Sequence, residues 1–216
     1  MSAETVKITE IFYSLQGETS TVGLPTVFVR LTGCPLRCVY CDTEYAFYGG
    51  QRMALTEVVA EVKKLNAPWV TVTGGEPLAQ KGSHSLMKAL CDEGYQVSLE
   101  TSGALSIADV DSRVTIILDL KTPSSGEMAR NLYENLPLLK AVDEVKFVVG
   151  DRQDYEWSRM KVDEYALLDK VGNVLFSPVF SKLSASDLAD WIVADRLAVR
   201  MQLQLHKILW NDEPGR

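Results

Sequence analysis

The sequence has few cysteines, few histidines and fewer basic than acidic side chains. Of its 216 residues, 4 are cysteine and 2 are histidine, and 29 Asp and Glu against 22 Lys and Arg give a formal charge of −7. A protein that binds DNA or RNA directly usually carries a basic face, so this charge does not favour a nucleic-acid partner. Four cysteines are also far from the dense cysteine content of a small secreted disulfide scaffold.

Long apolar runs and export signals are missing as well. No apolar stretch reaches the roughly 20 residues that a membrane-spanning helix needs, and the first residues do not have the pattern of a signal peptide. We therefore expect a cytoplasmic protein with reduced thiols and no membrane partner. Linkers, low-complexity runs and repeats are absent too, so we expect one domain over residues 1–216.

Three of the four cysteines nevertheless lie within eight consecutive positions. The segment 33–43 reads GCPLRCVYCDT and places Cys34, Cys38 and Cys41 on one short loop. Thiolates this close together bind soft metals or iron–sulfur clusters. A [4Fe–4S] cluster usually takes four cysteines, and no fourth cysteine lies nearby. Three would leave one iron open, and an open position is where a substrate or cofactor binds.

A zinc site is the main alternative for this loop. It would need Cys91, His84 or His206 as a fourth ligand, and structural zinc sites tend to pair their ligands as C-x-x-C units. Cys91 falls in a predicted apolar helix over residues 83–93, where a lone thiol usually packs in the core. A zinc-stabilised interaction domain is therefore the non-enzymatic alternative for this chain.

Apolar, β-branched segments alternate with helical ones about six times. This rhythm predicts an α/β fold with a parallel sheet and right-handed crossovers. Six units are fewer than the eight of a closed barrel, so we expect a partial TIM-like barrel of about six parallel strands. A doubly wound open sheet is the alternative. The predicted strands are 6–12, 25–31, 69–73, 96–103, 114–119, 144–149, 174–176 and 199–205. Helices are predicted over 56–65, 83–93, 131–140, 154–170 and 186–192.

Two charged residues interrupt predicted strands, and small or polar residues follow the strand ends. Arg30 is either an ion-pair partner in the core or a ligand for a substrate carboxylate, because a buried guanidinium needs an anion. Lys146 is expected to be a core ion-pair partner. Ligands of parallel α/β folds bind at the carboxyl ends of the strands. The expected rim comprises Arg30, the cysteine loop and residues 74–76, 101–103, 119–121 and 177.

The spacing C-x-x-x-C-x-x-C, with Tyr40 before the last cysteine, resembles the cluster motif of the radical S-adenosylmethionine (radical SAM) superfamily. One βα unit later, the sequence GGEP at 74–77 resembles the stretch that contacts the amino group of SAM in that superfamily. The resemblance implies a curved partial barrel, a [4Fe–4S] cluster and SAM as cofactor. The reduced cluster would pass one electron to SAM, and the resulting radical would abstract an unactivated hydrogen.

Further segments resemble the 7-carboxy-7-deazaguanine synthase family over almost the whole chain. This resemblance implies a lyase that converts 6-carboxy-5,6,7,8-tetrahydropterin to 7-carboxy-7-deazaguanine with loss of ammonia, on the route to queuosine and other 7-deazapurines. It also implies a magnesium ion with Thr43 as a ligand, an electron donor such as flavodoxin, and a homodimer. The segments that carry the resemblance are 11–18, 28–31, 41–43, 73–77, 100–103 and 204–207.

The same resemblance assigns binding residues but no catalytic side chain, because the SAM-derived radical abstracts the hydrogen. Residues 1–24 would form a substrate-side extension, and residues 199–216 would form an edge strand and a tail. The implied substrate contacts are Leu15, Gln16, Gly17, Glu18, Arg30 and Thr101, and the implied SAM contacts are Tyr40, Cys41, Asp42, Gly74, Gly75, Glu76, Gly103, Asp119, Leu120, Lys121, Ser177, Pro178, Val179 and Phe180.

The nearest enzymatic alternative is an activating enzyme for a glycyl-radical enzyme. Such enzymes are also small and share the cysteine spacing, but they act on a protein partner. The segment 11–18 and Arg30 are better explained by a small carboxylated substrate.

Anaerobic reconstitution with iron and sulfide distinguishes the cluster from zinc. We expect a coloured protein that contains iron, because three closely spaced thiolates fit an iron–sulfur cluster with one open iron. Metal analysis and the visible absorption spectrum provide the measurement. A colourless protein that holds zinc and no iron would support the interaction domain instead.

Overall fold

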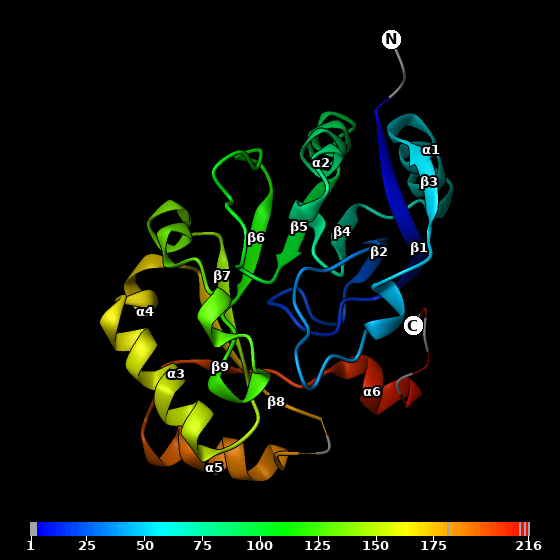
Figure 1. The fold of residues 1–216 in the computed structure, drawn as a ribbon. Coiled ribbons are helices and arrows are strands. Elements are labelled where there is room, and N and C mark those ends of the chain that lie inside the picture. Colours follow the sequence, from blue (N-terminus) through cyan, green and yellow to red (C-terminus); the bar gives the residue numbers. More distant parts are fainter. Residues whose placement is uncertain (1–3, 181, 212, 214, 216) are drawn as a thin grey trace.

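The computed structural model describes residues 4–180, 182–211, 213 and 215, and within them one nine-stranded sheet organises the chain. The strand order is β3-β1-β2-β4-β5-β6-β7-β8-β9. Every neighbouring pair from β2 to β9 is parallel, whereas β1 pairs antiparallel with β2 and β3. The sheet is curved, and β3 and β9 are its two free edges (Figure 1). The predicted partial barrel is thereby confirmed.

Most of the α-helices lie around the outside of the curved sheet, whereas the last one lies apart from them, near the C-terminus (Figure 1). The strands are β1 Thr5–Leu15, β2 Pro25–Leu31, β3 Gln51–Ala54, β4 Trp69–Gly74, β5 Gln96–Thr101, β6 Thr115–Asp119, β7 Glu144–Val149, β8 Asn173–Pro178 and β9 Arg200–Met201. The α-helices are α1 Leu55–Leu65, α2 Gly82–Asp92, α3 Arg152–Glu164, α4 Leu167–Lys170, α5 Ala185–Ala194 and α6 Leu205–Trp210. Five short 3₁₀ helices are η1 Glu44–Ala46, η2 Pro77–Ala79, η3 Pro123–Ser125, η4 Met128–Arg130 and η5 Tyr133–Leu138.

Several predicted elements differ from the observed ones. The predicted helix 154–170 is two helices, α3 and α4, because Ala166 adopts a left-handed conformation with φ of 48°. The predicted helix 131–140 is only the 3₁₀ helix η5, which contains Pro137. The four-residue strand β3 was not predicted from the sequence.

The predicted final strand 199–205 is also wrong in length. Only Arg200–Met201 pairs with β8, and the chain then turns into α6, which was not predicted and carries His206. The domain division itself stays a prediction. Parts of its two terminal segments, residues 1–3, 212, 214 and 216, lie outside the described residues.

The two faces of the sheet carry different side chains, because successive residues of a strand point to opposite sides. Val29, Val72 and Leu99 belong to the apolar core under the helices and are fully buried. Their chain neighbours Arg30 and Thr73 are paired in register on adjacent strands and lie on the inner face. These strands are therefore apolar on the outer face, whereas their inner face mixes polar residues with apolar ones such as Phe28 and Val148.

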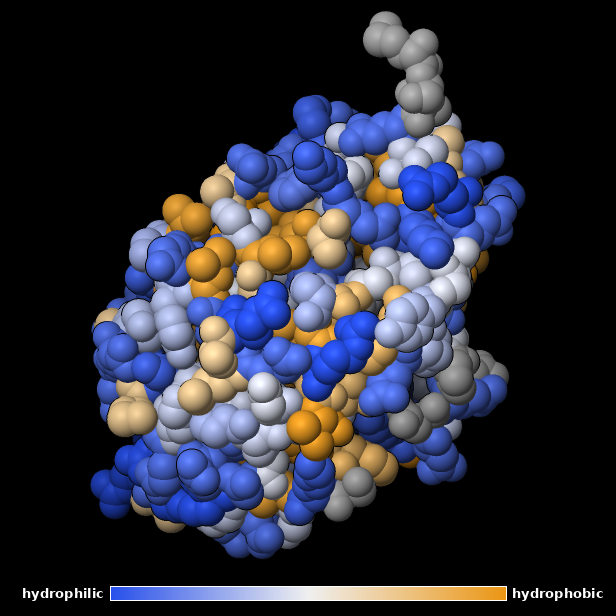
Figure 2. All heavy atoms as spheres, viewed as in Figure 1, coloured by the Kyte–Doolittle hydropathy of each residue, from blue (hydrophilic) through white to orange (hydrophobic). Residues whose placement is uncertain are grey.

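None of the helices in the described residues combines the length and the apolar character that crossing a bilayer requires. Hydrophilic residues cover much of the face in Figure 2, with smaller apolar areas between them.

Phe147 tests the packing between β7 and the outer helices. Its ring is fully buried and contacts the rings of Phe176 and Trp157 at centroid distances of 5.3 and 6.1 Å. We expect Phe147→Ala to destabilise the fold by about 3–5 kcal/mol, because the truncation leaves a cavity. Urea denaturation measures this, with Val193→Ala as control, since Val193 is 75% exposed. Equal effects of the two substitutions would contradict the assignment of Phe147 to the core.

Candidate active site

A cavity of about 640 Å³ opens at the carboxyl ends of the parallel strands. Its wall includes the loop after β1, the cysteine loop after β2, the ends of β4 to β7, the residues that follow β8, and the start of α6. Segments from both ends of the chain thus meet at one rim, as expected for a parallel α/β fold.

Most of the residues predicted to bind a ligand line this cavity. Five do not: Glu76, Gly103, Leu120, Ser177 and Pro178. The predicted residues that line it are Leu15, Gln16, Gly17, Glu18, Arg30, Cys34, Cys38, Tyr40, Cys41, Asp42, Thr43, Gly74, Gly75, Thr101, Asp119, Lys121, Val179 and Phe180.

The cysteine loop is fixed by its own backbone and by a neighbouring segment. The Cys41 amide donates to the Cys38 carbonyl at 3.1 Å, and the Val39 amide donates to Ser125 of η3 at 3.0 Å. The three thiols are half-buried and reduced. Burial raises the pKa of each thiol, that of Cys38 to about 11, so metal binding must displace their protons.

In this structure the three thiol sulfurs do not all lie within 4.8 Å of one another. Thiolates about 2.3 Å from one tetrahedral zinc stand roughly 3.8 Å apart. Among the described residues, the only three His, Cys, Asp or Glu ligands whose atoms all lie within 4.8 Å of one another are Glu18, Asp42 and His206. The cysteine sulfurs do not meet that spacing. Ligands of a cluster bind different irons and therefore stand farther apart.

Two glycines allow the end of β4 to touch the cysteine loop. The Gly75 amide donates to the Leu31 carbonyl at 3.1 Å, and the next amide, of Glu76, donates to Gly33 at 2.8 Å. A Cβ at Gly74 would lie 2.2 Å from the Leu31 oxygen, and one at Gly75 would lie 2.2 Å from the Gly33 oxygen. Real Cβ atoms do not approach so closely, so both positions require glycine.

Glu76 does not face the cavity, which differs from its predicted contact with the amino group of SAM. Its side chain is fully buried. One carboxylate oxygen accepts from the Leu78 amide and the Thr101 hydroxyl, each at 2.9 Å. The other accepts from the Ser102 amide at 2.7 Å and the Ser102 hydroxyl at 2.5 Å. Glu76 therefore fastens the loop after β5 to the end of β4.

An acidic and basic network joins the loop after β1 to the cysteine loop. Glu18 forms an ion pair with Lys146 of β7. The side-chain nitrogen Nε2 of Gln204 donates hydrogen bonds to Glu18 at 2.8 Å and to Asp42 at 2.9 Å. Lys207 Nζ forms an ion pair with Asp42 at 2.9 Å. The segment 204–207 thus bridges two loops that are far apart in the sequence.

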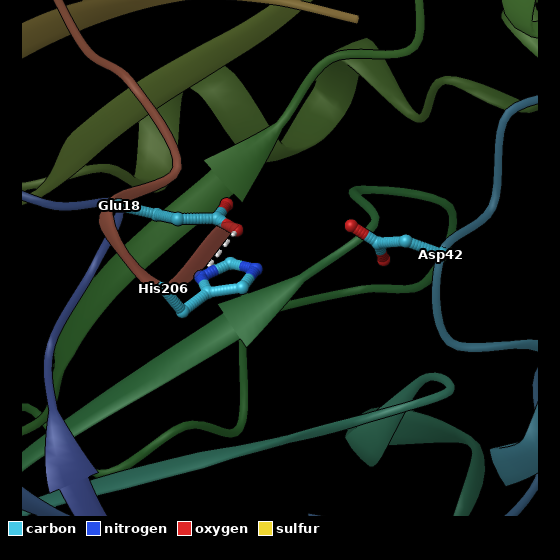
Figure 3. Close-up of side chains that lie close together, drawn as sticks. All are labelled: Glu18, Asp42 and His206. Carbon is cyan, nitrogen blue, oxygen red and sulfur yellow. Dashed lines mark ion pairs between the residues drawn. The ribbon is translucent and has the colours of Figure 1, made fainter. Parts of the chain in front are cut away.

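The charges in this network hold both carboxyl groups ionised. Burial alone would raise the pKa of Glu18, but the ammonium of Lys146 outweighs it and lowers that pKa. Burial would likewise raise the pKa of Asp42, and Lys207 holds it well below its usual range. Figure 3 shows Glu18 and His206 side by side, with His206 Nδ1 3.9 Å from the Glu18 oxygen, and Asp42 opposite them.

Arg30 forms one of the two contacts that the sequence left open, an ion pair, and its role as a ligand for a substrate carboxylate stays a prediction. Its Nε donates to Glu10 of β1 at 2.7 Å, and the guanidinium lies over the rings of Phe12 and Tyr45. It also lines the cavity. A guanidinium has five N–H donors, so one contact with Glu10 leaves capacity for an anionic ligand.

Two buried polar atoms near the ends of β6 and β8 have no hydrogen-bond partner among the described residues. They are Asp119 Oδ1 and Ser177 Oγ. The second oxygen of Asp119 contacts Lys121 at 3.0 Å. A buried polar atom without a partner is costly. Asp119 lines the cavity and is suited to a hydrogen bond from a bound cofactor, whereas Ser177 lies outside the cavity wall.

Comparison with known proteins identifies the family. Residues 28–125 match the family model described as "Radical SAM superfamily". A 7-carboxy-7-deazaguanine synthase from Koribacter versatilis is 46% identical, over 96% of this chain and 98% of that protein. One from Chlorobaculum tepidum is 46% identical over 99% and 98%. The chain belongs to the 7-carboxy-7-deazaguanine synthase family. The zinc-stabilised domain and the glycyl-radical activating enzyme are therefore set aside.

Solved structures agree on the fold of this family member. QueE from Escherichia coli superposes with a TM-score of 0.76 over 93% of this chain and 94% of that one, at 24% identity. SuiB from Streptococcus suis, bound to S-adenosylmethionine, superposes with a TM-score of 0.55 over 80% of this chain and 44% of its own, at 15% identity.

Membership of the radical SAM superfamily implies a [4Fe–4S] cluster and SAM as cofactors. The residues present fit both groups. Three reduced thiols line the cavity without a fourth, whereas Cys91 packs against the core from α2. The unpartnered oxygen of Asp119 lies in the cavity wall, at a strand end predicted to contact SAM.

Several lining residues were not predicted from the sequence as site residues. Glu100 is next to last in its strand, beside the predicted Thr101, so the rule that strand ends bind ligands could have found it. Lys146 was expected only as an ion-pair partner, which it is, and it also lines the cavity. Gln204 and Lys207 entered only through the family resemblance, and His206 also as a possible zinc ligand, because α6 at this position was not predicted.

Gly75→Ala tests the contact between β4 and the cysteine loop. The added Cβ would meet Gly33 and the Cys34 Cβ, so the loop must shift. We expect the iron content after anaerobic reconstitution to fall by about half or more, because the thiols lose their common geometry. Gly172→Ala is the control, since its Cβ would clash with the Ala141 carbonyl at the other end of the sheet. An unchanged iron content in the Gly75 variant would contradict this role.

Proposed function

We propose that the chain converts 6-carboxy-5,6,7,8-tetrahydropterin to 7-carboxy-7-deazaguanine with release of ammonia, on the route to queuosine and other 7-deazapurines. The observation that carries the proposal is the 46% identity, over nearly the full length of both chains, to relatives that bear this enzyme's name. When bound, the cluster and SAM supply a radical that can abstract an unactivated hydrogen.

Residues from both ends of the chain would hold the substrate. Arg30 would pair with its carboxylate, because a guanidinium and a carboxylate form strong charge-assisted hydrogen bonds. Gln16 and Thr101 line the same cavity and offer hydrogen-bonding groups. The charge of Glu18 is already balanced by Lys146, so Glu18 can accept hydrogen bonds without leaving an unpaired charge in the cavity.

Magnesium would bind beside Thr43. The Thr43 hydroxyl donates to Asp42 at 2.9 Å and lines the cavity. A single hydroxyl is a weak magnesium ligand, so the substrate carboxylate and water would complete the octahedron. Lys207 and Gln204 hold Asp42, and they would thereby fix the backbone that carries Thr43.

The segment around α6 would shield the site from water. The Leu205 amide donates to the Gly17 carbonyl at 3.2 Å, and Lys207 lies over the ring of Phe180. These contacts link the proposed substrate loop to a proposed SAM contact, and water exclusion protects reactive intermediates. The proposal also includes a one-electron donor such as flavodoxin, a homodimer and a cytoplasmic location.

Incubation with the carboxytetrahydropterin, SAM, a reductant and magnesium tests the proposal. We expect 7-carboxy-7-deazaguanine and ammonia, detected by liquid chromatography with mass spectrometry, and less product when magnesium is omitted. Cys38→Ala is the matched control and should give no product, because it removes a cluster ligand. A reconstituted, iron-loaded protein that forms no deazapurine would refute the proposed function.

A further inference from the structure

Glu100 is a cavity residue to which the reaction described above gives no task. It is next to last in β5 and lines the cavity. Ile117 on β6 is its partner in register, and the Thr73 hydroxyl on β4 donates to Glu100 Oε2 at 3.0 Å. Thr73 is in turn the register partner of Arg30 on β2. Arg30, Thr73 and Glu100 therefore form one row across three neighbouring strands on the inner face.

The carboxylate of Glu100 has acceptor capacity left. Gln16 Nε2 donates to Oε1 at 3.2 Å, and the Thr73 bond uses Oε2. An ionised carboxylate can accept about four hydrogen bonds, so each oxygen can take one more. Two free positions, one on each oxygen, suit a pair of parallel N–H donors.

The lysine near Glu100 forms its ion pair with another carboxylate. Lys146 pairs with Glu18, and among the residues that the structure describes no Lys or Arg forms an ion pair with Glu100. Burial and the neighbouring charge of Glu18 raise the pKa of Glu100. The carboxylate thus has only the neutral donors of Gln16 and Thr73 among the described residues, and a ligand with two N–H groups would fill its two remaining acceptor positions.

The row has the length of a two-ring heterocycle. Arg30 and Glu100 are two strand spacings apart, about 10 Å at about 4.8 Å per spacing. A pterin with a carboxylate at C6 carries that anion at one end and its N3–H and 2-amino group towards the other. Arg30 at one end of the row suits the carboxylate of this pterin, and Glu100 at the other end suits its N3–H and 2-amino group.

We propose that the carboxylate of Glu100 binds the N3–H and 2-amino group of the substrate, and so selects a 2-amino-4-oxopyrimidine ring. This inference rests on the proposed function and adds a specificity-determining residue to it. The pyrimidine edge is the same in the pterin and in the 7-deazaguanine product. Glu100 would therefore hold the unreactive ring in place while the other ring contracts.

Two stable ligands test the contact without turnover. 6-Carboxypterin keeps the 2-amino group, whereas 6-carboxylumazine has a carbonyl oxygen there, which would face the Glu100 carboxylate. Isothermal titration calorimetry on the reconstituted enzyme with SAM gives both affinities. We expect the enzyme to prefer the pterin by about 100-fold, because a site built for two N–H donors rejects an analogue that lacks one.

Glu100→Gln places an amide N–H where the carboxylate accepted, so it should weaken pterin binding and reduce the preference by about tenfold or more. Glu100→Asp keeps the charge and should keep the preference at lower affinity. Glu144→Gln is the matched control, because Glu144 is a buried carboxylate of the same sheet that accepts from the Ser20 amide and lies outside the cavity wall. It should leave the preference unchanged.

The outcomes separate this inference from the proposed function. If Glu100→Gln weakens both ligands equally, Glu100 acts only through its contacts with Gln16 and Thr73, and the inference is wrong. An unchanged preference in that variant also overturns it. If the unsubstituted enzyme neither binds 6-carboxypterin nor forms the deazapurine, the proposed function itself fails. Thermal unfolding of each variant verifies that it is folded.

Discussion

The whole site depends on one backbone contact, between the end of β4 and the loop that leaves β2. Amide groups of Gly75 and Glu76 donate to carbonyls of Leu31 and Gly33, and only glycine permits this approach. The contact fixes the cysteine loop against the sheet. Because Glu76 also binds Thr101 and Ser102, the same short turn sets the position of the loop after β5. Three neighbouring strand ends are thus held by one turn.

A second constraint is electrostatic. Two carboxylates, Glu18 and Asp42, line the cavity from different loops, and each has its own lysine, Lys146 and Lys207 respectively. Gln204 donates to both carboxylates. Without these cations, two like charges in a partly buried space would repel and be desolvated at considerable cost. The lysines allow the site to keep anionic acceptors at neutral pH.

The sequence was informative where residue type alone decides the structure. The cysteine spacing, the glycine pair and the strand–helix rhythm predicted the partial barrel and most of the cavity wall. It was less informative where tertiary contacts decide. Glu76 looked like a ligand group, but hydrogen bonds from Thr101 and Ser102 bury it. The segment 199–205 alternates like a strand, yet only two of its residues pair with β8 before α6 begins.

The bridge from Gln204 to Glu18 joins residues that are 186 positions apart in the chain. A ribosome must therefore release almost all of the intervening polypeptide before the cavity can close. Until then, the segment around α6 does not shield the cysteine loop and the strand ends. Any reactive species formed there would be exposed to solvent. The order of synthesis thus delays a complete site until the fold around it is finished.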